Sequence, residues 1–172
     1  LDGKLDPACR RSFPTPEISF YRMVGLSKLF PHSQRFGRYN MTYLDPDTET
    51  EVDSVVGAFM MVRRAAIQRV GLFDESYFMY GEDLDWAYRI KQAGWKVMYN
   101  PQVTVTHVKR AASRQSKRAQ TEFYRAMLIF YRRYYRATTP LWLHSLILMG
   151  LMLRGGPSLL QEIREPTPLH AI

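Results

Sequence analysis

A group of carboxylates between residues 74 and 85 contains the side chains best suited to chemistry. Five acids lie in the segment Phe73-Asp74-Glu75-Ser76-Tyr77-Phe78-Met79-Tyr80-Gly81-Glu82-Asp83-Leu84-Asp85. A carboxylate that follows a glycine at the start of a helix can face a cleft and take the proton of a bound hydroxyl, and Asp83 has the position for this task. Acids also stabilise the first turn of a helix through its dipole. The pattern alone leaves both interpretations open.

Other candidate side chains are more isolated. His107 ends a predicted strand on the same face as Val103 and Val105, where a single histidine is more often structural than a ligand. Arg63 and Arg64 follow an apolar run and would either pair with a phosphate or begin a surface helix. The acid-x-acid sequence at residues 45–47 lies in a polar loop, so we do not interpret it as a metal site.

The elements that must position these side chains alternate between strand and helix. The continuous apolar run at 55–62 predicts a strand covered on both faces, which is typical of an α/β fold. We expect helices at 63–70 and 82–93, each followed by a glycine in a left-handed conformation, Gly71 and Gly94. Further strands are predicted at 95–99 and 103–108, and the acidic stretch 45–53 is expected to be a solvated loop.

The C-terminal third differs from the rest in its charge. Residues 1–108 hold 13 Lys and Arg against 13 Asp and Glu, whereas residues 109–172 hold 11 against 3. Residues 115–136 have the pattern of a basic amphipathic helix, and residues 141–153 are almost wholly apolar but marginal in length for a membrane span. The tail is therefore the part expected to meet phosphates, nucleic acid or an anionic membrane.

Composition and cysteine content narrow the class of protein. A chain of 172 residues with 46% hydrophobic content is long enough for a sizeable core, which excludes collagen-like and disordered classes. The single cysteine, Cys9, fits a reducing compartment. Because the chain lacks an initiating Met and a signal peptide, we expect it to be a portion of a longer cytoplasmic protein.

The quoted residues together resemble the family 2 glycosyltransferases, most closely the bacterial rhamnosyltransferase-like branch that builds cell-surface polysaccharide. The resemblance covers about residues 1–118. It rests on the runs 52–64, 70–75 and 77–86, on Arg89, on Gly94-Trp95-Lys96-Val97 and on His107. The turn Asp2-Gly3 and the pair Arg10-Arg11 also look like the segment that precedes the signature in that branch.

The resemblance implies an α/β fold, namely the C-terminal part of a GT-A domain with a mixed sheet flanked by helices. It implies inverting transfer from a nucleotide-diphosphate sugar, with Asp83 as the general base, Glu82 orienting the acceptor or the base, and His107 as a ligand of a divalent metal (Mn²⁺ or Mg²⁺). Substrate-binding roles are expected for Gly57, Ala58, Asp85, Trp86 and Arg89. The family's acid-x-acid metal motif and first nucleotide-binding strands are not in this chain, so alone it is expected to be inactive.

We therefore expect residues 1–118 to be the acceptor-side part of a glycosyltransferase domain and residues 119–172 to be a helical tail. The expected partners of the protein are the sugar donor, a glycan or lipid-linked acceptor and the inner face of the cell membrane. Residues 119–160 are expected to dock on that membrane peripherally, and no nucleic acid is expected to bind. Alternatively, these helices pack on the catalytic domain or a second copy. The competing functions are a non-catalytic basic module that binds membrane or nucleic acid, and an inactive scaffold.

Overall fold

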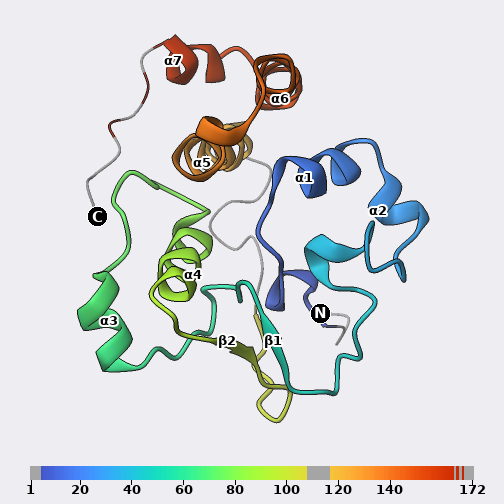
Figure 1. Cartoon of the computed structure of the whole chain (residues 1–172), viewed down its shortest axis with the longest axis vertical. Coiled ribbons are helices and arrows are strands. Elements are labelled where there is room, and N and C mark those ends of the chain that lie inside the picture. The colour runs from blue at the N-terminus through green and yellow to red at the C-terminus, as the bar shows by residue number, and fades with distance from the viewer. Residues whose placement is uncertain (1–4, 108–116, 165, 167, 169–172) are drawn as a thin grey trace. The chain divides into compact units, whose positions relative to one another are not determined.

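The computed structural model describes residues 5–107, 117–164, 166 and 168, and its chain divides into two compact units (Figure 1). The first unit comprises Leu1–Phe73 and Asp83–Lys109, and the second comprises Asp74–Glu82 and Arg110–Ile172. The loop before Asp83 thus groups with the C-terminal helices, while Asp83 itself groups with the N-terminal segment. The predicted boundary between residues 118 and 119 remains a prediction.

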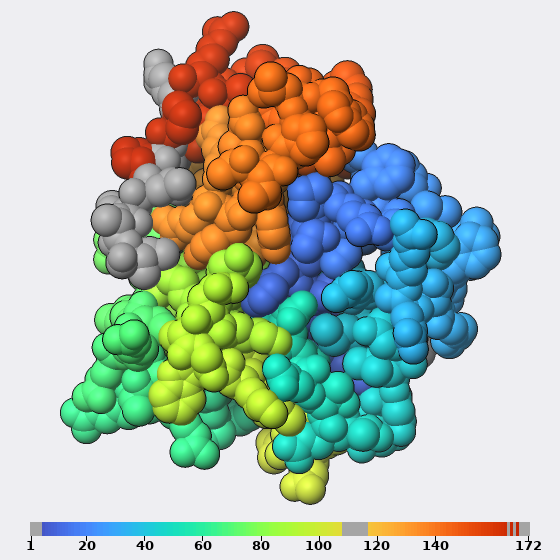
Figure 2. Space-filling model, in the orientation of Figure 1, coloured from blue at the N-terminus to red at the C-terminus, as the bar shows by residue number. Residues whose placement is uncertain are grey.

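The N-terminal part of the first unit consists of short helices separated by turns. The 3₁₀ helix η1 (Pro7–Cys9) is followed by α1 (Pro16–Met23), α2 (Leu26–Leu29) and the 3₁₀ helix η2 (Arg38–Asn40). Pro16 begins α1 directly after its N-cap Thr15, and Gly25, with a φ angle of 84°, separates α1 from α2. In Figure 2 the blue N-terminal segment lies beside the cyan segment, in agreement with the hydrogen bond from the Ser12 amide to the Tyr39 carbonyl.

The described part of the chain contains one sheet, an antiparallel pair of β1 (Thr50–Val52) and β2 (Val97–Tyr99) in which Val52 pairs with Val97. The prediction of a solvated loop at 45–53 is therefore wrong at its end. Val52 is 1% exposed, and the Lys91 ammonium bonds the Val52 carbonyl and the carboxylates of Glu51 and Asp53. A cation from helix α4 (Glu82–Gln92) thus compensates the acids and allows this segment to pair.

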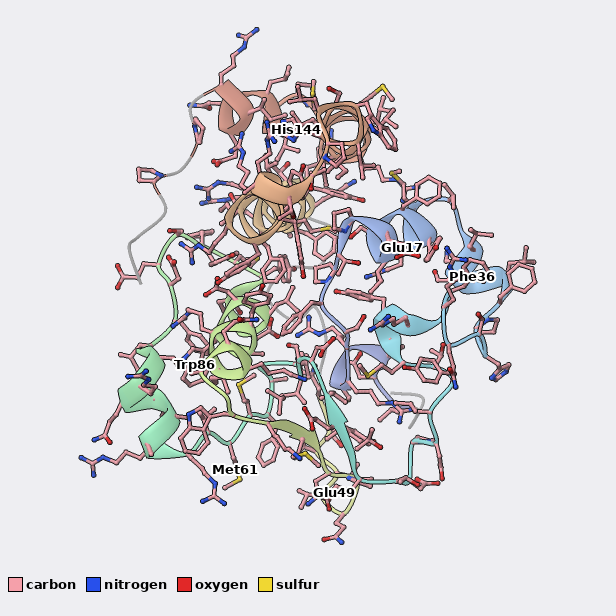
Figure 3. The ribbon with its side chains drawn as sticks, viewed as in Figure 1. Glu17, Phe36, Glu49, Met61, Trp86 and His144 are labelled. Carbon is pink, nitrogen blue, oxygen red and sulfur yellow. The ribbon has the colours of Figure 1, made fainter. Side chains whose placement is uncertain are left out.

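Helices α3 (Arg64–Val70) and α4 (Glu82–Gln92) confirm the two helices predicted around the acidic segment. Gly71 and Gly94 have φ angles of 77° and 86°, as expected for glycines that follow helices. The buried residues Val70, Trp86 and Ile90 form the core of this region, and Trp86 projects from α4 toward α3 in Figure 3. The apolar faces of α3 and α4 therefore meet at Trp86.

The run at 55–62 is not a strand, and no strand occurs at residues 103–107, while residue 108 lies outside the described residues. Near Gly57 the backbone is bonded to side chains: the Val55 carbonyl accepts from Arg11, and the Gly57 amide donates to Asp83. From Phe59 onward the side chains alternate, with Met60 against the core and Met61 87% exposed. The expected mixed sheet is thus limited, within the described ranges, to the β1–β2 pair.

The second unit is helical. Helix α5 (Lys117–Tyr134), the 3₁₀ helix η3 (Arg136–Thr138), α6 (Leu141–Gly155) and α7 (Leu159–Arg164) follow one another. Leu128 and Leu159, both 0% exposed, pack with Tyr131 and Leu151 in a common core. Burying each leucine contributes roughly 1.5–3 kcal/mol. Among the described residues, no helix is both long and apolar enough to cross a membrane.

The loop 74–82 packs on α5 within the second unit. Asp74 forms a buried ion pair with Arg133, and the Ser76 amide donates to Asp74 Oδ1 over 2.8 Å. Burial alone would raise the pKa of Asp74, but the bonds from Ser76 and the charge of Arg133 outweigh burial and lower it. The loop is therefore held to α5 by a charged side chain at its first residue.

Candidate active site around Asp83

Asp83, the second residue of α4, is held by a buried ion pair with Arg11. The Arg11 Nη2 atom lies 2.7 Å from Asp83 Oδ2, and the two side chains are only 12% and 9% exposed. Arg11 Nη2 also donates to the Val55 carbonyl over 3.0 Å and to Ser54 Oγ over 3.3 Å. A buried carboxylate needs such compensation, since an unpaired ion costs several kcal/mol to desolvate.

The guanidinium of Arg11 remains charged in this environment. Burial opposes its charge, but Asp83 and, to a smaller extent, Tyr39 raise the pKa of Arg11 above its usual value. Its backbone is fixed as well, because Arg11 forms an isolated antiparallel bridge with Ser54. Arg11 is therefore a rigid cation directed at the carboxylate.

Gly57 completes the support of the same oxygen. Its amide donates to Asp83 Oδ2 over 2.9 Å, and a Cβ atom added at Gly57 would lie 3.3 Å from the Asp83 Cβ. Both hydrogen bonds that Asp83 receives within the described ranges thus fall on Oδ2, which leaves Oδ1 for a further partner. Gly57 acts here on the carboxylate, and its expected place in a sugar pocket, together with that of exposed Ala58, remains a prediction.

The chain enters α4 through two residues in the left-handed region. Tyr80 and Gly81 have φ angles of 68° and 82°, and the positive angle is unusual for a tyrosine. Glu82 follows as the first residue of α4 and is half-buried. The strained turn therefore places Glu82 and Asp83 at the start of the helix, as the sequence predicted, where its dipole stabilises negative charge.

Three other residues predicted to bind substrate hold α4 to the loop that follows α3. Asp85 is 0% exposed and accepts from Arg89 Nε over 2.9 Å, while Arg89 also donates to the carbonyls of Val70 and Leu72. Trp86 Nε1 donates to the Gly71 carbonyl over 2.8 Å. These contacts are structural, and substrate contacts by Asp85, Trp86 and Arg89 remain predictions.

His107 lies on the surface of the same unit, 43% exposed, with its Nδ1 atom 3.8 Å from Asp6 Oδ2. A divalent metal in proteins is bound by more ligands than this pair supplies, and the described residues contain no group of three His, Cys, Asp or Glu side chains that could hold one. The residues present therefore do not form a metal site by themselves.

Sequence reasoning did not find the role of Arg11. Arg10-Arg11 entered only as part of the segment before the family signature, and Arg11 is separated from Asp83 by 72 positions. No periodicity or motif joins residues at such a distance. One signal was available: a buried acid at the start of a helix needs a cation to compensate its charge. That signal does not say which cation of the chain it is.

Comparison with known proteins places this site in a family. The model of the glycosyltransferase-like family 2 matches residues 26–125, which include Gly57, Asp83 and His107. The chain belongs to this family, and its mixed, helix-rich α/β structure with a two-stranded sheet is consistent with part of a GT-A domain. Family 2 enzymes generally use a divalent metal.

Its relatives among characterised proteins include rhamnosyltransferases. The chain is 34% identical over 108 residues to the N-acetylglucosaminyl-diphospho-decaprenol L-rhamnosyltransferase of Mycobacterium tuberculosis, a match that covers 63% of the chain and 34% of the relative. It is 42% identical over 60 residues to the rhamnosyltransferase WbbL of Escherichia coli K12, covering 35% of the chain and 23% of the relative. It is also 30% identical over 79 residues to the low-salt glycan biosynthesis hexosyltransferase Agl10 of Haloferax volcanii, covering 46% and 22%.

The chain thus spans about a third or less of the length of these relatives. No solved structure matches it significantly. The chain is accordingly rhamnosyltransferase-like and a member of a family of glycosyltransferases.

Proposed function

We propose that this chain contributes the acceptor side of an inverting glycosyltransferase, in which Asp83 is the general base. The observation that carries the proposal is the arrangement of Asp83, whose Oδ2 is held by Arg11 and Gly57 while Oδ1 is left for a partner. A fixed carboxylate with one oxygen available suits proton abstraction from a bound hydroxyl. The match of the family model to this region supports the reaction class.

In the proposed reaction the acceptor hydroxyl attacks the anomeric carbon of the donor sugar from the face opposite the diphosphate. The new carbon–oxygen bond forms as the bond to the diphosphate breaks, and the hydroxyl proton passes to Asp83 Oδ1. Arg11 and the Gly57 amide keep the carboxylate oriented during the transfer. Glu82, next to Asp83 at the start of α4, orients the acceptor.

The donor is proposed to be a nucleotide-diphosphate sugar. We assign Gly57, Ala58, Asp85, Trp86 and Arg89 to the binding of substrate on the basis of the family relation. A divalent metal, Mn²⁺ or Mg²⁺, would offset charge on the departing diphosphate, and His107 is its proposed ligand. No step above depends on that metal, because the described residues do not complete a site for it.

The acceptor is proposed to be a glycan or a lipid-linked saccharide used in cell-surface polysaccharide synthesis. The mycobacterial relative is named for a decaprenol-linked substrate. A lipid-linked acceptor calls for a location at a membrane, so we propose that the protein is cytoplasmic and peripheral on the inner face of the cell membrane. The charge excess of residues 109–172 supports this location.

We propose no nucleic-acid partner. Three arginines of α5 are engaged within the second unit, because Arg125 and Arg132 pair with Glu162 and Arg133 pairs with Asp74. These pairs support the proposal, because they engage three of the arginines that a nucleic-acid-binding face would use.

The test is Asp83→Asn in the complete protein that contains these residues. The amide keeps the size and hydrogen-bonding surface but loses the basicity, so turnover should fall about a hundredfold or more while donor binding, measured by calorimetry, is retained. Omission of divalent metal from the same assay tests the metal requirement. Near-normal turnover by Asp83→Asn would show that another group, with Glu82 the next candidate, is the base.

A further inference from the structure

Helix α6 exposes a row of apolar side chains along one face. Trp142, Leu146, Met149 and Leu153, here called the α6 stripe, are 67%, 47%, 53% and 79% exposed. Their spacing of four, three and four residues places them on one side of the helix. The stripe is therefore continuous along the helix, unlike the scattered exposed apolar residues that are normal on a protein surface.

The orientation of α6 is fixed by its opposite face. His144 Nδ1 lies 2.9 Å from the Tyr131 hydroxyl, and Leu151 belongs to the core with Leu128 and Leu159. Ile147 and Leu148 pack against the same core. The face of α6 opposite the stripe is therefore the one that packs in the core of the second unit. The stripe is a second apolar face, which this core does not use.

The charges of the helices in this unit are almost all positive. Residues 117–164 contain eight Lys and Arg against two Glu. Glu162 is buried and pairs with Arg125 and Arg132, and Glu122 pairs with Arg125. The acids of these helices are thus neutralised inside the unit. Four basic side chains of the same helices are exposed, namely Lys117, Arg118, Arg154 and Arg164.

From these observations we infer that the α6 stripe is a docking surface for an anionic lipid bilayer, with α6 lying parallel to the membrane plane. At 1.5 Å per residue, the 15 residues of α6 span roughly 22 Å, less than the roughly 30 Å of a hydrocarbon core. An exposed apolar face on a unit with an excess of positive charge is suited to the boundary between the headgroups and the acyl chains of an anionic bilayer. The inference deepens the proposed membrane location and does not depend on the transferase reaction.

A lipid surface explains the charge better than a second copy of the chain does. A second copy carries the same excess of positive charge, and like charges oppose association. An anionic leaflet attracts each basic residue by about 1 kcal/mol. The amphipathic helix expected to dock from sequence, α5, buries its apolar face instead, since Phe130 is 1% exposed.

The test is flotation of the chain with phosphatidylcholine vesicles that contain or lack phosphatidylglycerol. The stripe variant carries Trp142→Ser, Leu146→Ser and Met149→Ser. The matched control removes three apolar side chains elsewhere that are more exposed than the three replaced in the stripe, through Leu29→Ser, Met61→Ser and Leu72→Ser, which are 69%, 87% and 73% exposed in the parent. We expect the stripe variant to bind anionic vesicles about tenfold or more weakly, while the control and Asp83→Asn bind like the parent.

The fluorescence of Trp142 gives a second, local measurement. Iodide should quench it in the free chain, anionic vesicles should protect it, and Trp142→Phe should remove that change. Equal vesicle binding by the parent and the stripe variant would overturn the inference. The inference would also be overturned if the parent self-associated with rising concentration but did not bind vesicles, and if the stripe variant lost that self-association. The stripe would then be the contact between two copies of the chain. The two claims can be tested separately on Asp83→Asn. Its sugar transfer tests the proposed function, and its vesicle binding, which should be intact, tests this inference.

Discussion

Arg11 is the residue on which the orientation of Asp83 depends most. It contributes the shorter of the two hydrogen bonds to Asp83 Oδ2 and also bonds the Val55 carbonyl, which precedes Gly57 in the chain. It touches none of the reacting atoms in the proposed reaction. Arg11 is therefore a positioning residue, and its effect on the reaction should pass through the carboxylate.

Replacing Arg11 should lower turnover more than donor binding. We expect Arg11→Gln in the complete protein to reduce kcat about tenfold or more with a small change in KM for the donor, since orientation is lost and not the binding surface. Arg11→Lys keeps the charge but not the planar fork, so it should recover part of the loss. In the background of Asp83→Asn, Arg11→Gln should have little further effect on kcat. Independent, multiplicative losses would contradict a role through Asp83, and circular dichroism checks that each variant is folded.

At the scale of elements, α4 is attached to the rest of the first unit by polar groups as much as by its apolar face. Arg89 joins Asp85 to one carbonyl at the end of α3 and to one in the loop after it, and Trp86 bonds a third carbonyl between these two. These contacts fix the helix whose first turn carries Asp83. A substitution in this network is expected to lower the free energy of unfolding more than it lowers the affinity for substrate.

Arg89→Met should destabilise the first unit. Removing the cation breaks the buried ion pair with Asp85, a loss of about 3–5 kcal/mol in the free energy of unfolding. The double variant Asp85→Leu with Arg89→Met should recover a large part of that loss, because it removes both buried charges. Urea unfolding followed by circular dichroism measures both. Unchanged stability of Arg89→Met together with weaker donor binding would instead favour the predicted substrate role of Arg89.

The elements also show what the sequence can predict. Helices α3 and α4 were predictable, because apolar spacing, an acidic first turn and a terminal glycine are local signals. The conformation of the run at 55–62 was not predictable from the sequence. Whether an apolar segment becomes a strand depends on which partners its backbone N–H and C=O groups find for hydrogen bonds. Here the Gly57 amide donates to Asp83 and the Val55 carbonyl accepts from Arg11. The same long-range contact explains why Asp83 could be predicted from its motif while Arg11 could not.

At the scale of the whole molecule, the division into two units separates the proposed chemistry from the proposed membrane contact. Asp83, Arg11 and Gly57 belong to the first unit, whereas α6 and its stripe belong to the second. The units should therefore respond separately to a condition that acts on only one of them. A fall in pH tests this, because burial lowers the pKa of His144, which lies in the second unit.

Acidification is expected to weaken the second unit through His144. Burial, followed by the positive charges of Arg136 and Arg132, lowers the pKa of His144 below its usual value. An unfolded histidine has a pKa of about 6.5, so below that pH the unfolded chain binds more protons than the folded unit. Stability should be fully present above pH 6.5 and should decrease as the pH falls toward the lowered pKa. Asp74, whose pKa is also lowered, loses its contribution only below about pH 4.

Hydrogen exchange measured by mass spectrometry tests this expectation in each unit. After correction for the intrinsic pH dependence of exchange, peptides of α5–α7 should lose protection between pH 7 and about pH 5.5. Peptides of α4 should change less over the same range. His144→Gln keeps a polar partner for the Tyr131 hydroxyl but cannot take up a proton there, so it should remove most of the pH effect. An equal loss of protection in α4 peptides, or a full effect in His144→Gln, would contradict this expectation, because a group other than His144 would then carry the effect.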